Sequence, residues 1–81
     1  MENDRYKDMK AIDRLVVFLD SRKIKQRDFA QVINVKPNYI PLCRKNRNGV
    51  ISSTVLQRIF KAYPDLNMMW LICGEGNMLG K

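Results

Sequence analysis

The chain has 81 residues, a net charge of +7, a hydrophobic fraction of 46% and no histidine. This length allows one domain at most, and the hydrophobic fraction argues against disorder. No apolar run is long enough to span a membrane, and the N-terminus lacks the apolar core of a secretory signal, so we expect a cytoplasmic protein. The lack of histidine removes the commonest general base and metal ligand. We therefore expect no enzyme, no metal or cofactor and no small-molecule ligand.

The excess positive charge lies in one third of the chain. Residues 21–47 carry eight basic side chains against Asp28 alone, whereas the segments on either side are close to neutral. A basic segment of this density favours a polyanion such as nucleic acid as the partner, and a solvated lysine-rich surface is the alternative.

Two cysteines agree with a reducing compartment. Cys43 and Cys73 each lie in an apolar run, and their separation along the chain does not match the spacing of metal ligands. Two reduced, half-buried thiols are the favoured interpretation, and a disulfide between them is the alternative.

The first predicted helix covers residues 9–21. Its apolar positions follow the i, i+3, i+4, i+7 spacing of an amphipathic helix, and Asp8 is a plausible cap at its start. Residues 1–8 are expected to form a flexible arm ahead of it. The apolar positions are Ile12, Leu15, Val16 and Leu19.

Two short helices are predicted next, joined by a three-residue turn. The first runs from Gln26 to Ile33 and ends at Asn34, because asparagine tolerates the left-handed conformation found after a helix end. Pro37 suits the first position of the following helix, where a missing N–H costs nothing, and that helix should finish by Arg47. The residues expected to pack inward are Phe29, Ala30, Ile33, Val35, Ile40 and Cys43.

Two further helices complete the chain. Ser52 or Ser53 can cap a helix that ends before Pro64, and Asn67 can cap a short helix that Gly74 closes. Residues 75–81 are expected to be a loose tail. No two-residue alternation typical of strands occurs, so the predicted class is all-α with five helices.

Two segments carry a resemblance to a known family. QRDFAQVINVKPNYIPLCRK resembles the helix-turn-helix of the lambda-repressor and Cro-like (XRE) DNA-binding domains, and AYPDLNMMWLICGEGNML resembles the closing segment of many small bacterial and phage regulators of that family. The resemblance runs from about residue 11 to residue 79. It implies a compact five-helix DNA-binding domain over residues 9–74. The implied function is sequence-specific binding of double-stranded DNA by a transcriptional regulator, a phage-type repressor that binds as a homodimer.

The resemblance also implies roles for individual residues. Asparagine can pair with adenine, lysine can reach guanine, and leucine can pack on a thymine methyl group, whereas phosphate contacts fix register without reading sequence. The expected base readers are Lys36, Asn38, Leu42 and Lys45. The expected phosphate contacts are Gln26, Arg27, Tyr39, Arg44 and Arg47, although Tyr39 fits the edge of the core equally well. Met68, Met69 and Trp70 form a possible dimer surface, with a place in the core as their commoner role.

Three residues depart from the family pattern. Asn34 replaces the usual glycine, and Lys36 replaces the usual serine or threonine cap. Pro41 is the serious departure, because a proline inside a helix costs about 3 kcal/mol. Either the third helix starts later than Pro37, or it kinks at Pro41. If the helix is lost, the basic segment fits a second hypothesis, a protein-interaction module such as an antitoxin-like or adaptor domain.

Overall fold

A computed structural model describes residues 4–80 and shows an all-α domain of 34 × 26 × 23 Å. No strand occurs in this part of the chain, and none of its helices is long and apolar enough to cross a membrane. The helices are α1 (Asp4–Lys7), α2 (Ala11–Ser21), α3 (Gln26–Val32), α4 (Tyr39–Asn46), α5 (Ser53–Ala62) and α6 (Met68–Cys73).

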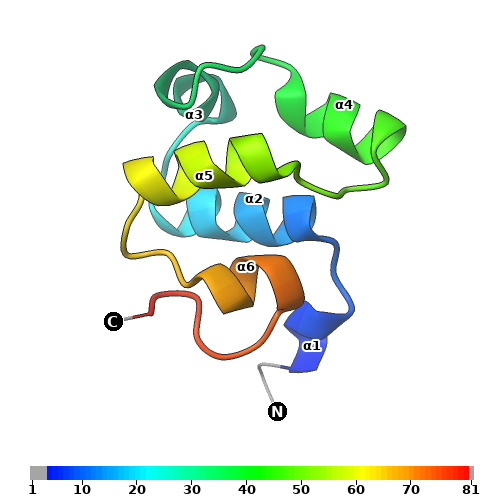
Figure 1. Ribbon diagram of the computed structural model, residues 1–81, viewed down its shortest axis with the longest axis vertical. Helices are drawn as coiled ribbons and strands as arrows, with labels where there is room; N and C mark the ends of the chain where they lie inside the picture. The colour runs from blue at the N-terminus through cyan, green and yellow to red at the C-terminus, as the bar shows by residue number, and fades with distance from the viewer. Residues whose placement is uncertain (1–3, 81) are drawn as a thin grey trace.

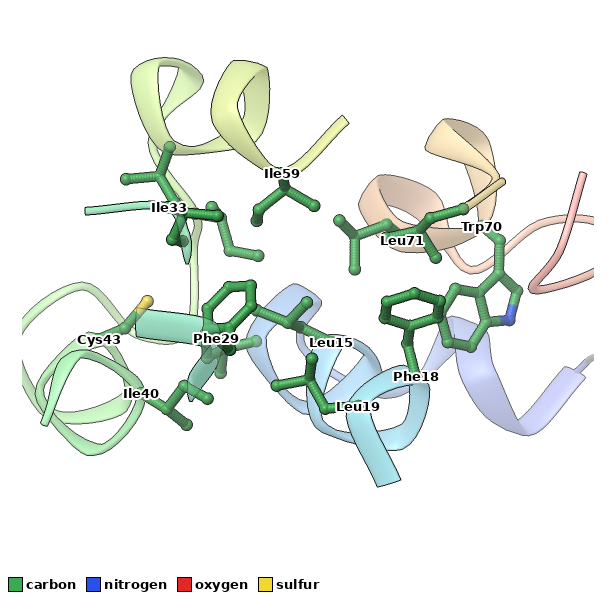
Figure 2. Close-up of a cluster of buried hydrophobic side chains, with 14 residues drawn as sticks. Leu15, Phe18, Leu19, Phe29, Ile33, Ile40, Cys43, Ile59, Trp70 and Leu71 are labelled. Atoms are coloured by element: carbon green, nitrogen blue, oxygen red, sulfur yellow. The ribbon is translucent and has the colours of Figure 1, made fainter. Parts of the chain in front are cut away.

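Helix α2 lies at the centre of the domain and packs against α3, α4 and α6 (Figure 1). Its apolar stripe is wide because it meets neighbours on more than one side. Phe18 is fully buried beside the predicted core residues Leu15 and Leu19. The buried cluster in Figure 2 joins α2 to the other helices through Phe29, Ile33, Ile40, Cys43, Ile59, Trp70 and Leu71.

The five helices predicted from the sequence are all present, and several of their ends follow the predicted chemistry. Ser52 caps α5 by accepting a hydrogen bond from the Val55 amide, and Asn67 caps α6 in the same way from the Met69 amide. Asn34 is left-handed after α3, with φ of 60°. The predicted cap of the first long helix is wrong, because α2 begins after Lys10 and no side chain caps it.

Near both ends, the described residues form structure where the sequence suggests a flexible arm and a loose tail. Of the expected arm, residues 4–7 form helix α1, and the rings of Tyr6 and Trp70 pack edge to face with their centroids 5.3 Å apart; residues 1–3 lie outside the described residues. In the expected loose tail, the Asn67 amide donates to the Met78 carbonyl at 2.9 Å and the Gly80 amide to the Asp65 carbonyl at 3.0 Å. The described part of the tail, up to Gly80, therefore packs back on the segment before α6.

Arg14 is the one charged side chain buried in the described part of the chain, with 4% of its surface exposed. Its guanidinium donates to the carbonyls of Leu71 at 2.8 Å and Ile72 at 2.7 Å, and also to those of Tyr6 and Met9. The carbonyls of Leu71 and Ile72 lie in the last turn of α6 and that of Tyr6 near the end of α1, where a cation is favourable, and that of Met9 lies just after α1. Burial lowers the pKa of Arg14 from its ordinary value, but an arginine remains protonated in a protein.

Replacing Arg14 by methionine should lower the free energy of unfolding by about 3 kcal/mol, because buried carbonyls lose charged donors that no neighbour replaces. Urea unfolding followed by circular dichroism measures the loss. Arg22→Met is the matched control, since the Arg22–Asp65 ion pair is exposed and should be worth under about 1 kcal/mol. Equal losses in the two variants would contradict the role given to Arg14.

Candidate nucleic-acid interface

Helices α3 and α4 and the connection between them occupy one end of the long axis, opposite α1 and α6 (Figure 1). The basic segment 21–47 begins at the end of α2 and runs through both helices, so its charge gathers at this end of the domain. The connection covers residues 33–38 and is longer than the three-residue turn predicted from the sequence.

Helix α4 presents a polar face to solvent. Asn38, Leu42 and Lys45 follow the i, i+4, i+7 spacing and therefore share one side of the helix. Asn38 and Lys45 are exposed and Leu42 is half-buried, whereas Ile40 and Cys43 on the other side are buried in the core. Lys36, the remaining expected base reader, is exposed in the connection just ahead of the helix.

The start of α4 corrects the sequence interpretation. The helix begins at Tyr39 rather than at Pro37, and Asn38 takes the N-cap position without a side-chain cap bond. Pro41 is thus the third residue of the helix, where the N–H that proline lacks would have no partner within the helix. The later start accommodates Pro41 without the cost of a proline in a helix interior.

Arg44, one of the expected phosphate contacts, is held by an acidic residue of α2. Its Nε donates to Asp13 Oδ1 at 2.8 Å, and its Nη2 lies 2.7 Å from the same oxygen. Both side chains are partly exposed, so the pair is worth under about 1 kcal/mol and can be broken. A phosphate would have to compete with Asp13 for this guanidinium.

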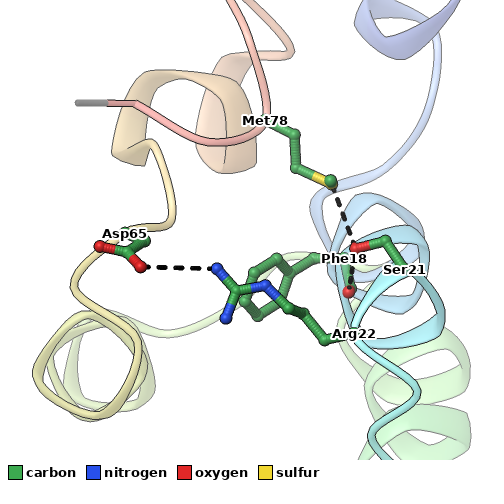
Figure 3. Close-up of polar contacts among 5 residues, drawn as sticks. All are labelled: Phe18, Ser21, Arg22, Asp65 and Met78. Carbon is green, nitrogen blue, oxygen red and sulfur yellow. Dashed lines mark hydrogen bonds and ion pairs between the residues drawn. The ribbon is translucent and has the colours of Figure 1, made fainter.

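Arg22, at the start of the basic segment, is also engaged within the domain (Figure 3). Its guanidinium lies 5.3 Å from the centre of the Phe18 ring and 3.6 Å from Asp65. Ion pairs therefore occupy two of the eight basic side chains of the segment. Six have no ion-pair partner among the described side chains: Lys23, Lys25, Arg27, Lys36, Lys45 and Arg47.

The other polar phosphate candidates are accessible. Gln26 and Arg27 are exposed in the first turn of α3. Arg47 is exposed at the end of α4, and its Nε donates to the Val50 carbonyl at 3.3 Å, which leaves the rest of its guanidinium available. Exposed cations therefore flank α4 at its C-terminal end and on the neighbouring helix.

Tyr39 belongs to the edge of the core rather than to the surface. Its hydroxyl is buried and has no hydrogen-bond partner in the described structure. Burial, followed by the nearby Cys43 thiol, raises the pKa of Tyr39 to about 12. A buried hydroxyl cannot reach a phosphate in this conformation, so Tyr39 is removed from the expected contacts.

The possible dimer surface is reduced to two of its three residues. Trp70 is 0% exposed and packs in the core, whereas Met68 and Met69 are each 52% exposed on α6. Met68 and Ile72 line an apolar groove of about 570 Å³ against Leu56 and Phe60 of α5. The groove lies away from α3 and α4.

The thiols differ more than the sequence suggests. Both cysteines are free, but Cys43 is buried and Cys73 is exposed. Cys43 donates to the Val50 carbonyl at 3.3 Å and so joins α4 to the loop that follows it.

Sequence reasoning overlooked two residues that bear on this surface. Asp13 of α2 was given no role from the sequence, yet it holds Arg44. Arg58 of α5 was not singled out, yet it bonds to the connection between α3 and α4. Both contacts join residues more than 20 positions apart, and no local pattern identifies them.

The free cations at this end of the domain can attract a polyanion. Asn38, Leu42 and Lys45 can then contact the groups that the polyanion exposes. Comparison with protein-family models, curated proteins and solved structures gives no match for this chain. The chemistry of the exposed residues is therefore the basis for inferring a function.

Tyr39→Phe should leave the domain as stable or more stable at pH 7, because it removes a buried hydroxyl that has no partner, a defect costing about 1–3 kcal/mol. At high pH the two proteins should differ further. Unfolded Tyr39 ionises near pH 10, whereas the native residue keeps its proton to about pH 12, so the wild type should lose stability over this window. Urea unfolding at pH 7 and pH 11 measures both effects. A variant that is less stable at both pH values would show that the hydroxyl makes a stabilising bond.

Proposed function

We propose that the chain is a sequence-specific double-stranded DNA-binding protein that acts as a transcriptional regulator, with α3 and α4 as its helix-turn-helix. The observation that supports this most is the face of α4, where Asn38, Leu42 and Lys45 share one side, with Lys36 exposed just ahead of the helix and Arg47 exposed at its end. The resemblance of residues 26–45 to the lambda-repressor and Cro-like family agrees with it.

The dimensions of α4 suit insertion into DNA. Eight residues give a helix about 12 Å long, and the major groove is about 12 Å wide. Because the helix begins at Tyr39, Asn38 and Lys36 lie at its leading end, the part of a recognition helix that reads base edges. In this proposal Asn38 and Lys36 read bases at that end, and Leu42 and Lys45 read them further along.

Phosphate contacts in this proposal come from both helices. Gln26 and Arg27 would bind the backbone from the start of α3, and Arg47 from the end of α4. Such contacts set the register of the protein on the duplex and supply most of the salt-dependent affinity. Arg44 contributes less than its charge suggests, because it must first leave Asp13.

The proposal includes two copies on one operator, since related regulators bind paired half-sites about one helical turn apart. Met68 and Met69, together with Ile72, are exposed apolar residues of α6 that are available for contact between copies. A palindromic binding site would support this part of the proposal, and a single unpaired half-site would contradict it.

Selection of bound sites from a random duplex library is the direct test. We expect a consensus sequence, and Asn38→Ala should lose about 1–3 kcal/mol of preference at one base pair while its affinity for random duplex stays nearly unchanged. Gln31→Ala on α3, an exposed amide outside the proposed readers, is the matched control. A wild type that selects no sequence would overturn the proposal and favour a basic protein-interaction module instead.

The salt dependence of DNA binding should distinguish the role of Arg47 from that of Arg44. Arg47→Ala should weaken binding to all duplexes alike and lower the slope of log affinity against log salt by about one unit. Arg44→Ala should change this slope less, because Asp13 already neutralises Arg44 in the free protein. Fluorescence anisotropy at several salt concentrations measures both. Equal changes in the two variants would show that phosphate displaces Asp13 from Arg44.

A further inference from the structure

The connection between α3 and α4 is tied to another helix by one side chain. Nη1 of Arg58, in α5, donates to the carbonyl of Asn34 at 3.2 Å and to that of Ile33 at 3.3 Å. In the described structure, the other hydrogen bonds of residues 33–38 stay within α3, α4 and the connection itself.

The two carbonyls accept no other hydrogen bond from the described residues. Helix α3 ends at Val32 with Ile33 as its C-cap, and the backbone then turns through the left-handed Asn34, so neither carbonyl faces a helical donor. Locally the turn is closed by the Val35 amide, which donates to Ala30 at 2.9 Å. Arg58 therefore supplies the donor that the turn itself lacks.

Arg58 lies on a helix that is anchored in the core. Val55 and Ile59, its neighbours on α5, are buried in the core, and Arg58 itself extends over the exposed side of the helix. The tie thus connects a helix fixed in the core to the segment that leads into α4. Beyond the tie, residues 36–38 are exposed, and no side chain caps the start of α4.

We propose that Arg58 is a positioning residue for base reading: by holding the carbonyls of Ile33 and Asn34 it sets the direction in which Lys36 and Asn38 are presented to DNA. This role rests on the proposed function and extends it to a residue that need not touch DNA. A loss of the tie frees the turn around Asn34, and a small change there moves the leading end of α4.

The competing role for an exposed arginine is a direct phosphate contact. The two roles make different predictions, because a phosphate contact contributes to the affinity for every duplex and to its salt dependence. A positioning residue acts on the preference among sequences and leaves the salt slope on random duplex as it was.

The experiment compares Arg58→Met with Lys61→Met. Methionine keeps an unbranched apolar stem and removes both the charge and the donors. Lys61 is the matched control because it lies one turn further along α5, is exposed, and makes no hydrogen bond with the described residues. Four quantities are measured for each protein: the affinity for the selected site, the affinity for random duplex, the salt slope on random duplex, and the amide resonances of Asn34 and Val35 in the free protein.

Arg58→Met should lower the preference for the selected site over random duplex by about five- to ten-fold, on the order of one mismatched base pair. Its salt slope should match that of Lys61→Met, and its Asn34 and Val35 amide resonances should shift while those of the control do not. Urea unfolding at pH 7 checks that both variants remain folded.

Other outcomes overturn the inference in distinguishable ways. A salt slope that falls by about one unit in Arg58→Met alone would assign Arg58 to phosphate binding. An unchanged sequence preference, in a wild type that selects a site, would overturn the positioning role and leave the proposed function standing. A wild type that selects no site would overturn both, and the amide resonances would still report whether the tie exists in solution.

Discussion

The Arg14 guanidinium holds together the parts of the chain on which the rest of the structure depends. The free-energy cost of burying its charge is offset by the hydrogen bonds it donates to four carbonyls, and two of these carbonyls belong to the last turn of α6. The remaining carbonyls belong to Tyr6 of α1 and to Met9, so one side chain of α2 holds α6 and the segment around α1. With α6 and α1 in place, α2 is left to pack its other side against α3 and α4.

The charged side chains fall into two groups: some hold the fold together, and others face solvent. Arg14, Arg22 and Arg44 are engaged with the carbonyls or carboxylates of neighbouring elements. The cations left free lie mainly on α3, on α4 and in the segments that lead into them. In the proposed function these free cations bring DNA to the domain, and the short polar face of α4 reads it. The apolar groove on α5 and α6 lies elsewhere on the molecule.

The helices themselves could be predicted because their signals are local. Ser52 and Asn67 cap the helices they were expected to cap, and Asn34 takes the left-handed turn expected of it, since each of these depends on a few neighbouring residues. The start of α4 was harder to predict. Pro37 and Pro41 both prefer a first helical turn, and the sequence alone allowed either a later start or a kink.

What the sequence by itself determined about this protein is its all-α class, the limits of most helices and the concentration of positive charge in residues 21–47. These follow from periodicity, capping and composition, which act over one or two helical turns. Only the tertiary structure decided which charges are free, because Arg14, Arg44 and Arg58 find their partners through contacts that cross between helices. It also decided that Trp70 lies inside the core and that the Tyr39 hydroxyl is buried at its edge, since burial depends on what the other helices cover.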